Sequence, residues 1–314
     1  MNEQERKEYF QKLQNLPILS EELADLHSHT TTSDGTLTPK ELIDLALQRR
    51  LSALAITDHD TVDALPFAID YTKNKPLLIV QGIEFSCEEL PRGFEEVHIL
   101  GLFIDHRNEV LRKRLVHLLE KRKEREQKMI EKLQSFGFDI TFEEVAARVG
   151  VAFGRPHIAK ILVEKYPQQF KTVQDVFENY IGSGKPAYIP RLDKIKVKEA
   201  ISLIHTTGGI ASLAHPCLYK DEDVVELVSY FVACGGDALE TFYPYYVNAK
   251  GVSLEESQHK NALVQKLAQE KSLLQTGGSD FHGIIRPIML GDCGISMEMF
   301  ERLKERRMNE FKIP

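Results

Sequence analysis

Short apolar segments alternate with amphipathic helical segments along most of this chain. Helices are predicted at residues 39–50 and 61–72, and an amphipathic segment precedes each of the last three apolar segments. Seven apolar segments have the length and composition of β-strands, at residues 24–27, 52–57, 77–80, 97–104, 209–214, 238–242 and 272–276. This order favours an α/β fold in which crossover helices join parallel strands, either closed as a barrel or open as a doubly wound sheet.

Length and composition fit an ordinary globular protein. The 314 residues accommodate one barrel plus an insertion, and the net charge of −7 provides no overall positive field for nucleic acid. The N-terminal sequence MNEQERKEYFQKL is too polar for a signal peptide, and no apolar run in the sequence is long enough to span a membrane. We therefore predict a cytoplasmic protein with reduced cysteines and no membrane association, and the sequence implies no stable protein partner.

Histidines and carboxylates gather at the ends of the predicted strands. Parallel barrels build their active sites at the carboxyl ends of their strands, so residues distant in sequence can share one site there. Side chains alternate along a strand, so His27 and His29 lie on the same side and both can reach one ion. The other residues at or near strand ends are His59, Glu84, His98, His215, Asp280 and His282.

Each of these residues has an ordinary explanation when it is taken alone. His98 fits a core histidine, Glu84 fits a helix cap, and Asp34 before Gly35 fits a common turn. Their number favours a metal centre, because buried imidazoles and carboxylates are costly without a partner and a divalent cation suits both. The remaining histidines do not join the set: His106, His117 and His259 are predicted to be solvent-exposed, and His205 to contact a helix C-terminus.

Several motifs occur in a fixed order between about residues 24 and 283: DLHSHTTTSDG, AITDHDTVDAL, GIEFS with EVHILGLFID, LAHP and GGSDFHG. Together they resemble the polymerase and histidinol phosphatase (PHP) family. The resemblance is strongest to its stand-alone phosphoesterase branch, which includes nucleoside 3′,5′-bisphosphate phosphatases that also act as exonucleases on short RNA. It implies a distorted seven-stranded (β/α)7 barrel, in agreement with the seven strand segments above.

The same resemblance implies two to three divalent ions, most typically manganese, with zinc or iron also compatible. Asp34, His59, His215 and His282 are expected to contribute to catalysis as well as to ligation. Asp25 and Asp58, beside ligand histidines, either accept a hydrogen bond from them or cap the local backbone. The implied ligands are His27, His29, Glu84 and Asp280 for one ion, Asp34, His59 and His282 for a second, and His98 and His215 with a bridging Glu84 for a third.

Such a cluster suits phosphoryl transfer, because two ions about 3.5–4 Å apart can share a hydroxide and clamp the phosphoryl oxygens. The leading hypothesis is attack of this bridging hydroxide on the 3′-phosphate of a nucleoside 3′,5′-bisphosphate. The same site suits 5′→3′ exonuclease action on short RNA, and a histidinol-phosphate-type phosphatase is a third alternative. From a different class, the chain could be a non-catalytic metal-binding module.

About a hundred residues between the fourth and fifth strands exceed what a crossover needs. We predict a leader at residues 1–22, a barrel at 23–105 and 195–314, and an inserted α-helical cap domain at 106–194. Its helices are predicted at about residues 107–136, 141–149, 156–166 and 173–181. The charged run KRKERE in the first of these helices is expected to be a solvated face.

Two stretches of the insertion offer groups for an anionic substrate. Arg155 and His157 stand in FGRPH at a predicted helix start, where backbone N–H groups favour anions. Lys185 follows a glycine-rich turn in IGSGKPAY. We expect all three to contact a small phosphorylated substrate, a nucleotide or a short oligonucleotide.

Overall fold

The computed structural model describes residues 22–147, 154–190, 194–219 and 221–310, together with Leu13 and Leu19. Nearly all of the predicted leader lies outside the described residues, as do the last two positions of the helix predicted at 141–149. Within the described residues, no helix is long and apolar enough to cross a membrane.

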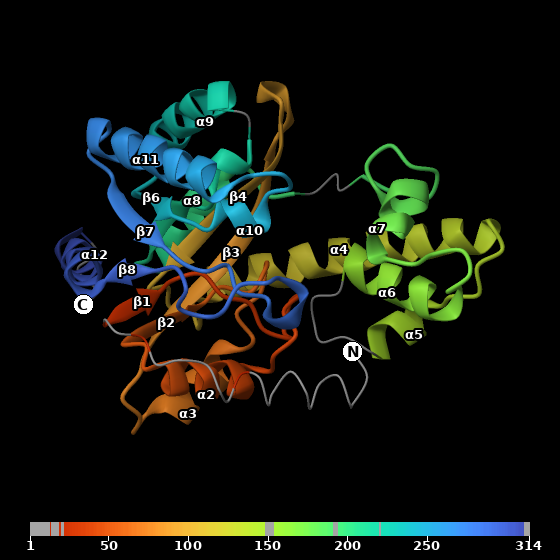
Figure 1. The fold of residues 1–314 in the computed structure, drawn as a ribbon, viewed down its shortest axis with the longest axis horizontal. Helices are drawn as coiled ribbons and strands as arrows, with labels where there is room; N and C mark the ends of the chain where they lie inside the picture. The colour runs from red at the N-terminus through yellow and green to blue at the C-terminus, as the bar shows by residue number, and fades with distance from the viewer. Residues whose placement is uncertain are drawn as a thin grey trace.

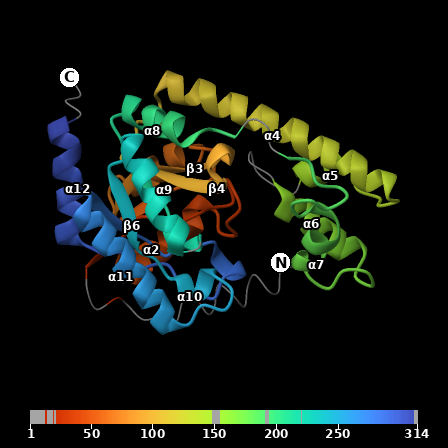
Figure 2. The same ribbon diagram turned by 90° about the horizontal axis from the view of Figure 1, so that it is seen from above.

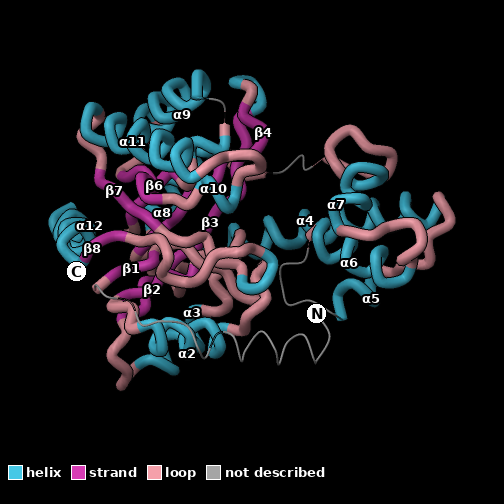
Figure 3. Tube along the Cα trace, viewed as in Figure 1, coloured by secondary structure: helices cyan, strands magenta, loops and turns pink. Residues whose placement is uncertain are grey.

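A single β-sheet forms the centre of the molecule (Figures 1 and 3). Its strand order is β7-β6-β5-β4-β3-β2-β1-β8. The strands are β1 (Leu23–Asp25), β2 (Ala53–Ile56), β3 (Leu78–Glu89), β4 (Phe94–Leu102), β5 (Ile210–Leu213), β6 (Ala238–Phe242), β7 (Leu274–Gly277) and β8 (Ile295–Ser296). The N–H of Leu26 donates to the carbonyl of Gly277 (3.1 Å), so the segment after β1 meets the end of β7 and the sheet is nearly closed. The predicted α/β class is therefore confirmed.

The sheet departs from the predicted parallel arrangement at two places. β4 runs antiparallel to both β3 and β5, and the two-residue β8 pairs antiparallel with β1. β3 is also much longer than predicted: Ile83, Phe85 and Cys87 place their side chains in the main hydrophobic core before the chain turns back into β4. Because side chains alternate, Glu84 lies on the opposite face of this strand and inside it, rather than after its end.

Helices cover the outside of the sheet, as Figures 1 and 2 show. The first begins at Pro39, as the sequence predicted, and the structure adds a capping box between Thr38 and Glu41. The covering helices are α2 (Pro39–Arg49), α3 (Leu65–Thr72), α8 (Val197–Thr206), α9 (Asp221–Ala233), α10 (Tyr245–Asn248), α11 (Leu254–Glu270) and α12 (Met297–Glu310). The main hydrophobic core lies between these helices and the sheet.

The long helix α4 (Glu109–Ser135) extends away from the barrel and carries the other inserted helices at its far end (Figures 1 and 2). Near its N-terminus, Leu111, Leu115 and Leu118 join the barrel core. Near its C-terminus, Met129 and Leu133 join a second core. That core is shared with α5 (Phe142–Ala147), α6 (Arg155–Lys165), α7 (Val173–Val176) and the π-helical turn Phe177–Ile181. One apolar stripe thus ties two cores together.

The histidines outside the strand-end set lie mostly where the sequence placed them, with one correction. His106 is only 8% exposed, and its Nδ1 hydrogen-bonds to Gln81 Oε1 (2.6 Å), so the prediction of a solvated side chain was wrong. Its charged neighbours in sequence concealed the buried partner on β3. His117 and His259 are exposed. His205 lies in the last turn of α8 and also contacts Asp237 Oδ2 (2.8 Å).

Gly278 provides a test of the closure between β1 and β7. A Cβ atom at this position would lie within 3.0 Å of the backbone nitrogen and Cβ of His27 and of Asp25 Oδ1. We expect Gly278→Ala to force the two strand ends apart, with a loss of about 1–3 kcal/mol in the free energy of unfolding, as is typical of overpacked sites. Chemical denaturation measures this change. A variant as stable as the parent would contradict the close packing described here.

Candidate active site

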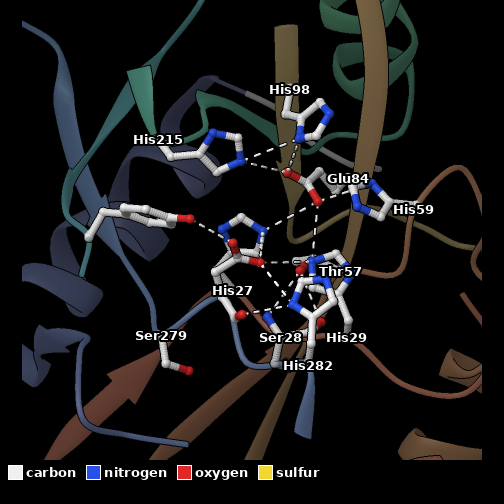
Figure 4. Close-up of polar contacts among 12 residues, drawn as sticks. His27, Ser28, His29, Thr57, His59, Glu84, His98, His215, Ser279 and His282 are labelled. Carbon is white, nitrogen blue, oxygen red and sulfur yellow. Dashed lines mark hydrogen bonds and ion pairs between the residues drawn. The ribbon is translucent and has the colours of Figure 1, made fainter. Parts of the chain in front are cut away.

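The segment after β1 brings two histidines into the barrel. The N–H of His29 donates to the carbonyl of Phe281 (2.9 Å), and Ser28 Oγ donates to the carbonyl of Ala55 (2.6 Å). The chain is thereby clamped on both sides in an extended form. The rings of His27 and His29 both point into the site (Figure 4), whereas the Ser28 side chain between them bonds β2. This confirms the shared direction that the alternation predicted.

Glu84 on β3 lies at the centre of the site (Figure 4). One carboxylate oxygen, Oε2, is 3.4 Å from His27 Nε2, 3.2 Å from His29 Nε2 and 3.1 Å from His59 Nδ1. The other oxygen, Oε1, is 3.0 Å from His98 Nδ1 and 3.2 Å from His215 Nε2. His98 Nδ1 and His215 Nε2 are themselves 3.3 Å apart. A single side chain therefore contacts histidines from the ends of three strands and from within β4.

Asp280 presents one oxygen to the same histidines. Its Oδ1 is 3.4 Å from His27 Nε2 and 3.3 Å from His29 Nε2. Its Oδ2 accepts a hydrogen bond from the Tyr243 hydroxyl (2.7 Å) and contacts Arg286. The two oxygens thus have different roles: the contacts of Oδ2 with Tyr243 and Arg286 fix the orientation of the carboxylate, so that Oδ1 faces the histidines.

A second group of donors lies next to His29. Asp34 Oδ1 is 3.3 Å from His282 Nε2 and 3.6 Å from His29 Nδ1, and Asp34 Oδ2 is 3.9 Å from His59 Nε2. One ligand atom from each of these four residues lies within 4.8 Å of every other, which is close enough to surround one ion. All nine residues predicted to bind metal therefore meet in one place.

The donor set fits divalent cations. Among the described residues, His27 Nε2, both ring nitrogens of His29 and His282 Nε2 are buried without a hydrogen-bond partner. His27 Nδ1–H donates to Glu240 Oε1 (2.9 Å) and His282 Nδ1–H donates to the Asp280 carbonyl (2.8 Å), so both Nε2 lone pairs face the site. Two ligands of one ion about 2.1 Å away lie roughly 3.0–3.4 Å apart, which matches the spacing of these atoms.

The buried carboxylates are held in their charged forms. Burial alone would raise the pKa of Glu84, but His59, His27 and His98 hold it well below its usual value. Burial likewise opposes ionisation of Asp280, yet Arg286, His27 and His282 hold the pKa of this carboxyl well below its usual value. Ionised carboxylates beside imidazoles form a site of mixed oxygen and nitrogen donors that suits manganese, zinc or iron.

Three residues behind the ligand candidates were missed by the sequence analysis. Glu240 on β6 bonds His27 through Oε1 and accepts the backbone N–H of His215 through Oε2 (2.7 Å), so it orients two of the histidines. Tyr243 and Arg286 hold Asp280. Glu240 carried a usable signal, since a fully buried carboxylate inside the apolar strand ALETF needs a partner.

Asp25 and Asp58 hold backbone and hydroxyl groups rather than histidine rings. Asp25 accepts from Ser279 N (3.0 Å), Ser279 Oγ (2.6 Å) and Gly291 N (2.9 Å), and burial raises its pKa to about 6. Asp58 accepts from Thr30 N (2.7 Å) and Ser33 Oγ (2.6 Å). The capping alternative is therefore the one that the structure supports for both residues.

A cavity of about 230 Å³ opens beside Asp34, His59 and His98, and its opposite wall comes from the inserted helices. The prediction of a fully solvated KRKERE face was wrong, because Arg122, Arg125 and the fully buried Glu126 belong to this wall. The charged run follows helical periodicity, so one of its sides turns toward the barrel. Arg155 and His157 on α6 also line the cavity, together with Lys194, whereas Lys185 is exposed and outside it.

Two contacts fix this wall relative to the cluster. Arg122 Nη2 on α4 contacts Asp60 Oδ2, and Asp60 N–H donates to the carbonyl of Glu84 (2.9 Å).

On α6, the N–H of Gly154 donates to His157 Nδ1 (3.0 Å), which leaves Nε2–H as a donor. Burial, with Lys160 nearby, lowers the pKa of His157 to about 4. This imidazole is therefore a neutral donor at physiological pH.

Comparison with known proteins identifies the family. The PHP domain matches residues 25–227. The chain is 35% identical to the 5′-3′ exoribonuclease Rnm of Salmonella typhimurium over 82% of this chain and 84% of that protein. It is 33% identical to a 3′,5′-nucleoside bisphosphate phosphatase of Chromobacterium violaceum over 82% of this chain and 86% of that protein. The crystal structure of a candidate metal-dependent phosphoesterase from Bifidobacterium adolescentis has a TM-score of 0.76 and 28% identity, covering 92% of this chain and 98% of that one. By its motifs, its sheet and these matches, this chain belongs to the PHP domain family.

Proposed function

We propose that this enzyme, a hydrolase of phosphate esters, removes the 3′-phosphate of nucleoside 3′,5′-bisphosphates. The observation that supports this substrate is the pairing of two unlike walls in one cavity. Candidate metal ligands form one wall, and guanidinium and ammonium groups from the inserted helices and Lys194 form the other. A substrate with two phosphates can engage both walls at once, whereas a monophosphate can engage only one.

The nine residues that converge in the cluster would hold the ions in this proposal. His27, His29, Glu84 and Asp280 take one ion, Asp34, His59 and His282 a second, and His98 and His215 with Glu84 a third, with manganese as the preferred metal. Divalent ions in such a cluster activate water for in-line attack and offset the charge of the phosphoryl oxygens. Glu240 and the Asp280 carbonyl keep protons on the Nδ1 atoms of His27 and His282, so that the Nε2 atoms stay available as ligands.

The second phosphate contacts the inserted helices, which act as a cap over the barrel mouth. Arg155 presents a planar guanidinium that lies over the rings of Phe177 (5.4 Å) and Tyr188 (5.6 Å), and these contacts limit its rotation. His157 adds its Nε2–H as a neutral donor. Glu96 Oε1 lies 3.6 Å from Arg155 and 3.5 Å from Lys194, and a bound phosphate replaces this weak contact.

A second candidate function, 5′→3′ exonuclease action on short RNA, uses the same cluster. It is supported by the Salmonella relative and by a larger cavity that adjoins the first. A histidinol-phosphate-type substrate has no second phosphate for the cationic wall and is therefore disfavoured. A non-catalytic module would not need the complete donor set or the cationic wall that faces it across the cavity.

A substrate screen on the purified protein tests the proposal. We expect manganese-supplemented protein to contain at least two divalent ions per chain, and to hydrolyse 3′,5′-bisphosphates better than 3′-monophosphates or histidinol phosphate. Chelation should abolish turnover and manganese should restore it. Elemental analysis and phosphate release measure these effects. Less than one ion per chain, or metal binding without hydrolysis of any phosphate ester, would refute the multinuclear phosphatase.

The role of Glu240 can be tested by metal binding alone. Glu240→Gln keeps the shape of the side chain but removes the charge that orients His27 Nδ1–H and the His215 backbone. Changes to such supporting groups typically weaken metal affinity by about 10–100-fold, and we expect a loss in that range from calorimetric manganese titration. Glu178→Gln, on the exposed side of the inserted helices, serves as the control. Equal affinities in the two variants would show that Glu240 does not support the cluster.

The role of Arg155 can be tested by kinetics. Loss of one charge-assisted contact typically costs about 1.5–3 kcal/mol, so Arg155→Ala should lower kcat/KM for a 3′,5′-bisphosphate at least tenfold, in contrast to a 3′-monophosphate. Metal content should stay unchanged. Arg107→Ala, at a side chain that is 79% exposed, is the matched control. An equal loss on both substrates would place Arg155 outside the second phosphate site.

A further inference from the structure

The arginine and lysine side chains that line the active-site cavity face carboxylates of two kinds. Arg122 contacts Asp60, and Arg125 Nη1 contacts Glu126 Oε1 (2.6 Å). The side chains of these two carboxylates are only 5% and 0% exposed. Buried pairs of this kind are fixed parts of the fold, because breaking one leaves an uncompensated buried charge.

The carboxylate that faces Arg155 and Lys194 is of the other kind. Glu96 Oε1 lies 3.6 Å from Arg155 Nη2 and 3.5 Å from Lys194 Nζ, and the Glu96 side chain is 60% exposed. The two cations are the covered members of these pairs, with side chains that are 22% and 12% exposed. Arg155 is also held over the rings of Phe177 and Tyr188. The protein therefore fixes the cations, whereas the carboxylate can turn into water.

Glu96 lies beside the cluster and at the boundary between two cavities. Side chains alternate along β4, so Glu96 and the candidate ligand His98 project from the same face of this strand. Glu96 lines the active-site cavity and also the larger cavity that adjoins it. An anion bound between Arg155 and Lys194 meets this carboxylate, and like charges at such short range repel each other. A phosphate and Glu96 therefore compete for the same two cations.

We propose that Glu96 is a competitor built into the second phosphate site, which weakens the binding of substrate and product and so promotes product release. The proposal rests on the proposed function, because removal of the 3′-phosphate leaves a nucleoside 5′-monophosphate that keeps the phosphate held by Arg155. Binding energy that substrate and product share does not speed the chemical step, and a product held too tightly slows turnover. When the product leaves, Glu96 returns to the two cations. Glu96 is thus a positioning residue that acts through Arg155 and Lys194.

Binding of the product to the manganese-loaded protein tests this role directly. Glu96→Gln keeps the size of the side chain and removes its charge. An exposed ion pair typically changes an equilibrium by about 1.4- to 5-fold, so loss of two such contacts should tighten calorimetric binding of adenosine 5′-monophosphate by about three- to tenfold. Glu226→Gln is the matched control, since Glu226 is 59% exposed and lies 3.6 Å from Arg92, outside both cavities. This control should bind the nucleotide as the parent does.

Kinetics separate a competitor from a structural residue and from a direct substrate contact. In Glu96→Gln, KM for adenosine 3′,5′-bisphosphate should fall with the product affinity constant, while kcat does not rise and metal content is unchanged. In an Arg155→Ala background the same substitution should have a smaller effect, because residues in contact are not additive. The proposal is overturned if the product binds no more tightly, if KM rises or metal is lost, or if the gain is equal with and without Arg155, which would indicate a general field effect.

Failure of the proposed function is recognised separately. If the parent protein hydrolyses no 3′,5′-bisphosphate, the phosphatase assignment fails, and calorimetric binding of adenosine 5′-monophosphate then decides the role of Glu96 alone. Binding that Glu96→Gln tightens and Glu226→Gln does not supports a competitor at an anion site. Binding that is equal in all three proteins, or absent from all three, overturns it.

Discussion

The candidate active site depends on one buried carboxylate. Five imidazoles, those of His27, His29, His59, His98 and His215, lie 3.0–3.4 Å from the two oxygens of Glu84. A carboxylate buried this deeply is tolerated only with compensating charge and well-placed partners. Those partners come from segments at the ends of β1, β2 and β5 and from β4, so they assemble only when the sheet curves almost to closure. The charge balance of Glu84 and the near closure of the sheet thus depend on the same segments of the sequence.

The composition of the cluster could be predicted because it follows from topology. Strands that run in the same direction end at the same side of a barrel, so His27, His59 and Asp280 had to converge once their strands were recognised. Details of strand pairing could not be predicted in this way. The antiparallel β4 and the continuation of β3 past Val80 depend on a hairpin whose turn, Leu90–Arg92, contains Pro91 and ends at Gly93, a turn signal that the sequence analysis did not use. Glu84 was consequently placed after a strand that in fact contains it.

Residues whose role depends on a contact with a segment distant in sequence were the hardest to predict. Arg122 and Arg125 stand in a run of charges that is compatible with a solvated helix, and only packing of α4 against the barrel shows which side of the helix is covered. His106 was misjudged for the same reason, since its partner Gln81 lies on a strand distant in sequence. Local pattern shows which residues carry chemistry, but the neighbours that orient or bury them depend on contacts across the fold.

Because α4 is one continuous helix, a small change of its angle at the barrel moves its far end by a larger distance. A helix of 27 residues is about 40 Å long, so a tilt of about 5° at its barrel end displaces its tip by about 3.5 Å. The tip carries α6, and with it Arg155, whereas the metal ligand candidates stay with the barrel. The contact between Arg122 and Asp60 lies near the middle of α4 and therefore sets the angle of this helix relative to the barrel. The distance between the cluster and the Arg155 guanidinium thus depends on the angle of one helix, and it can change without a change in any residue of the cluster.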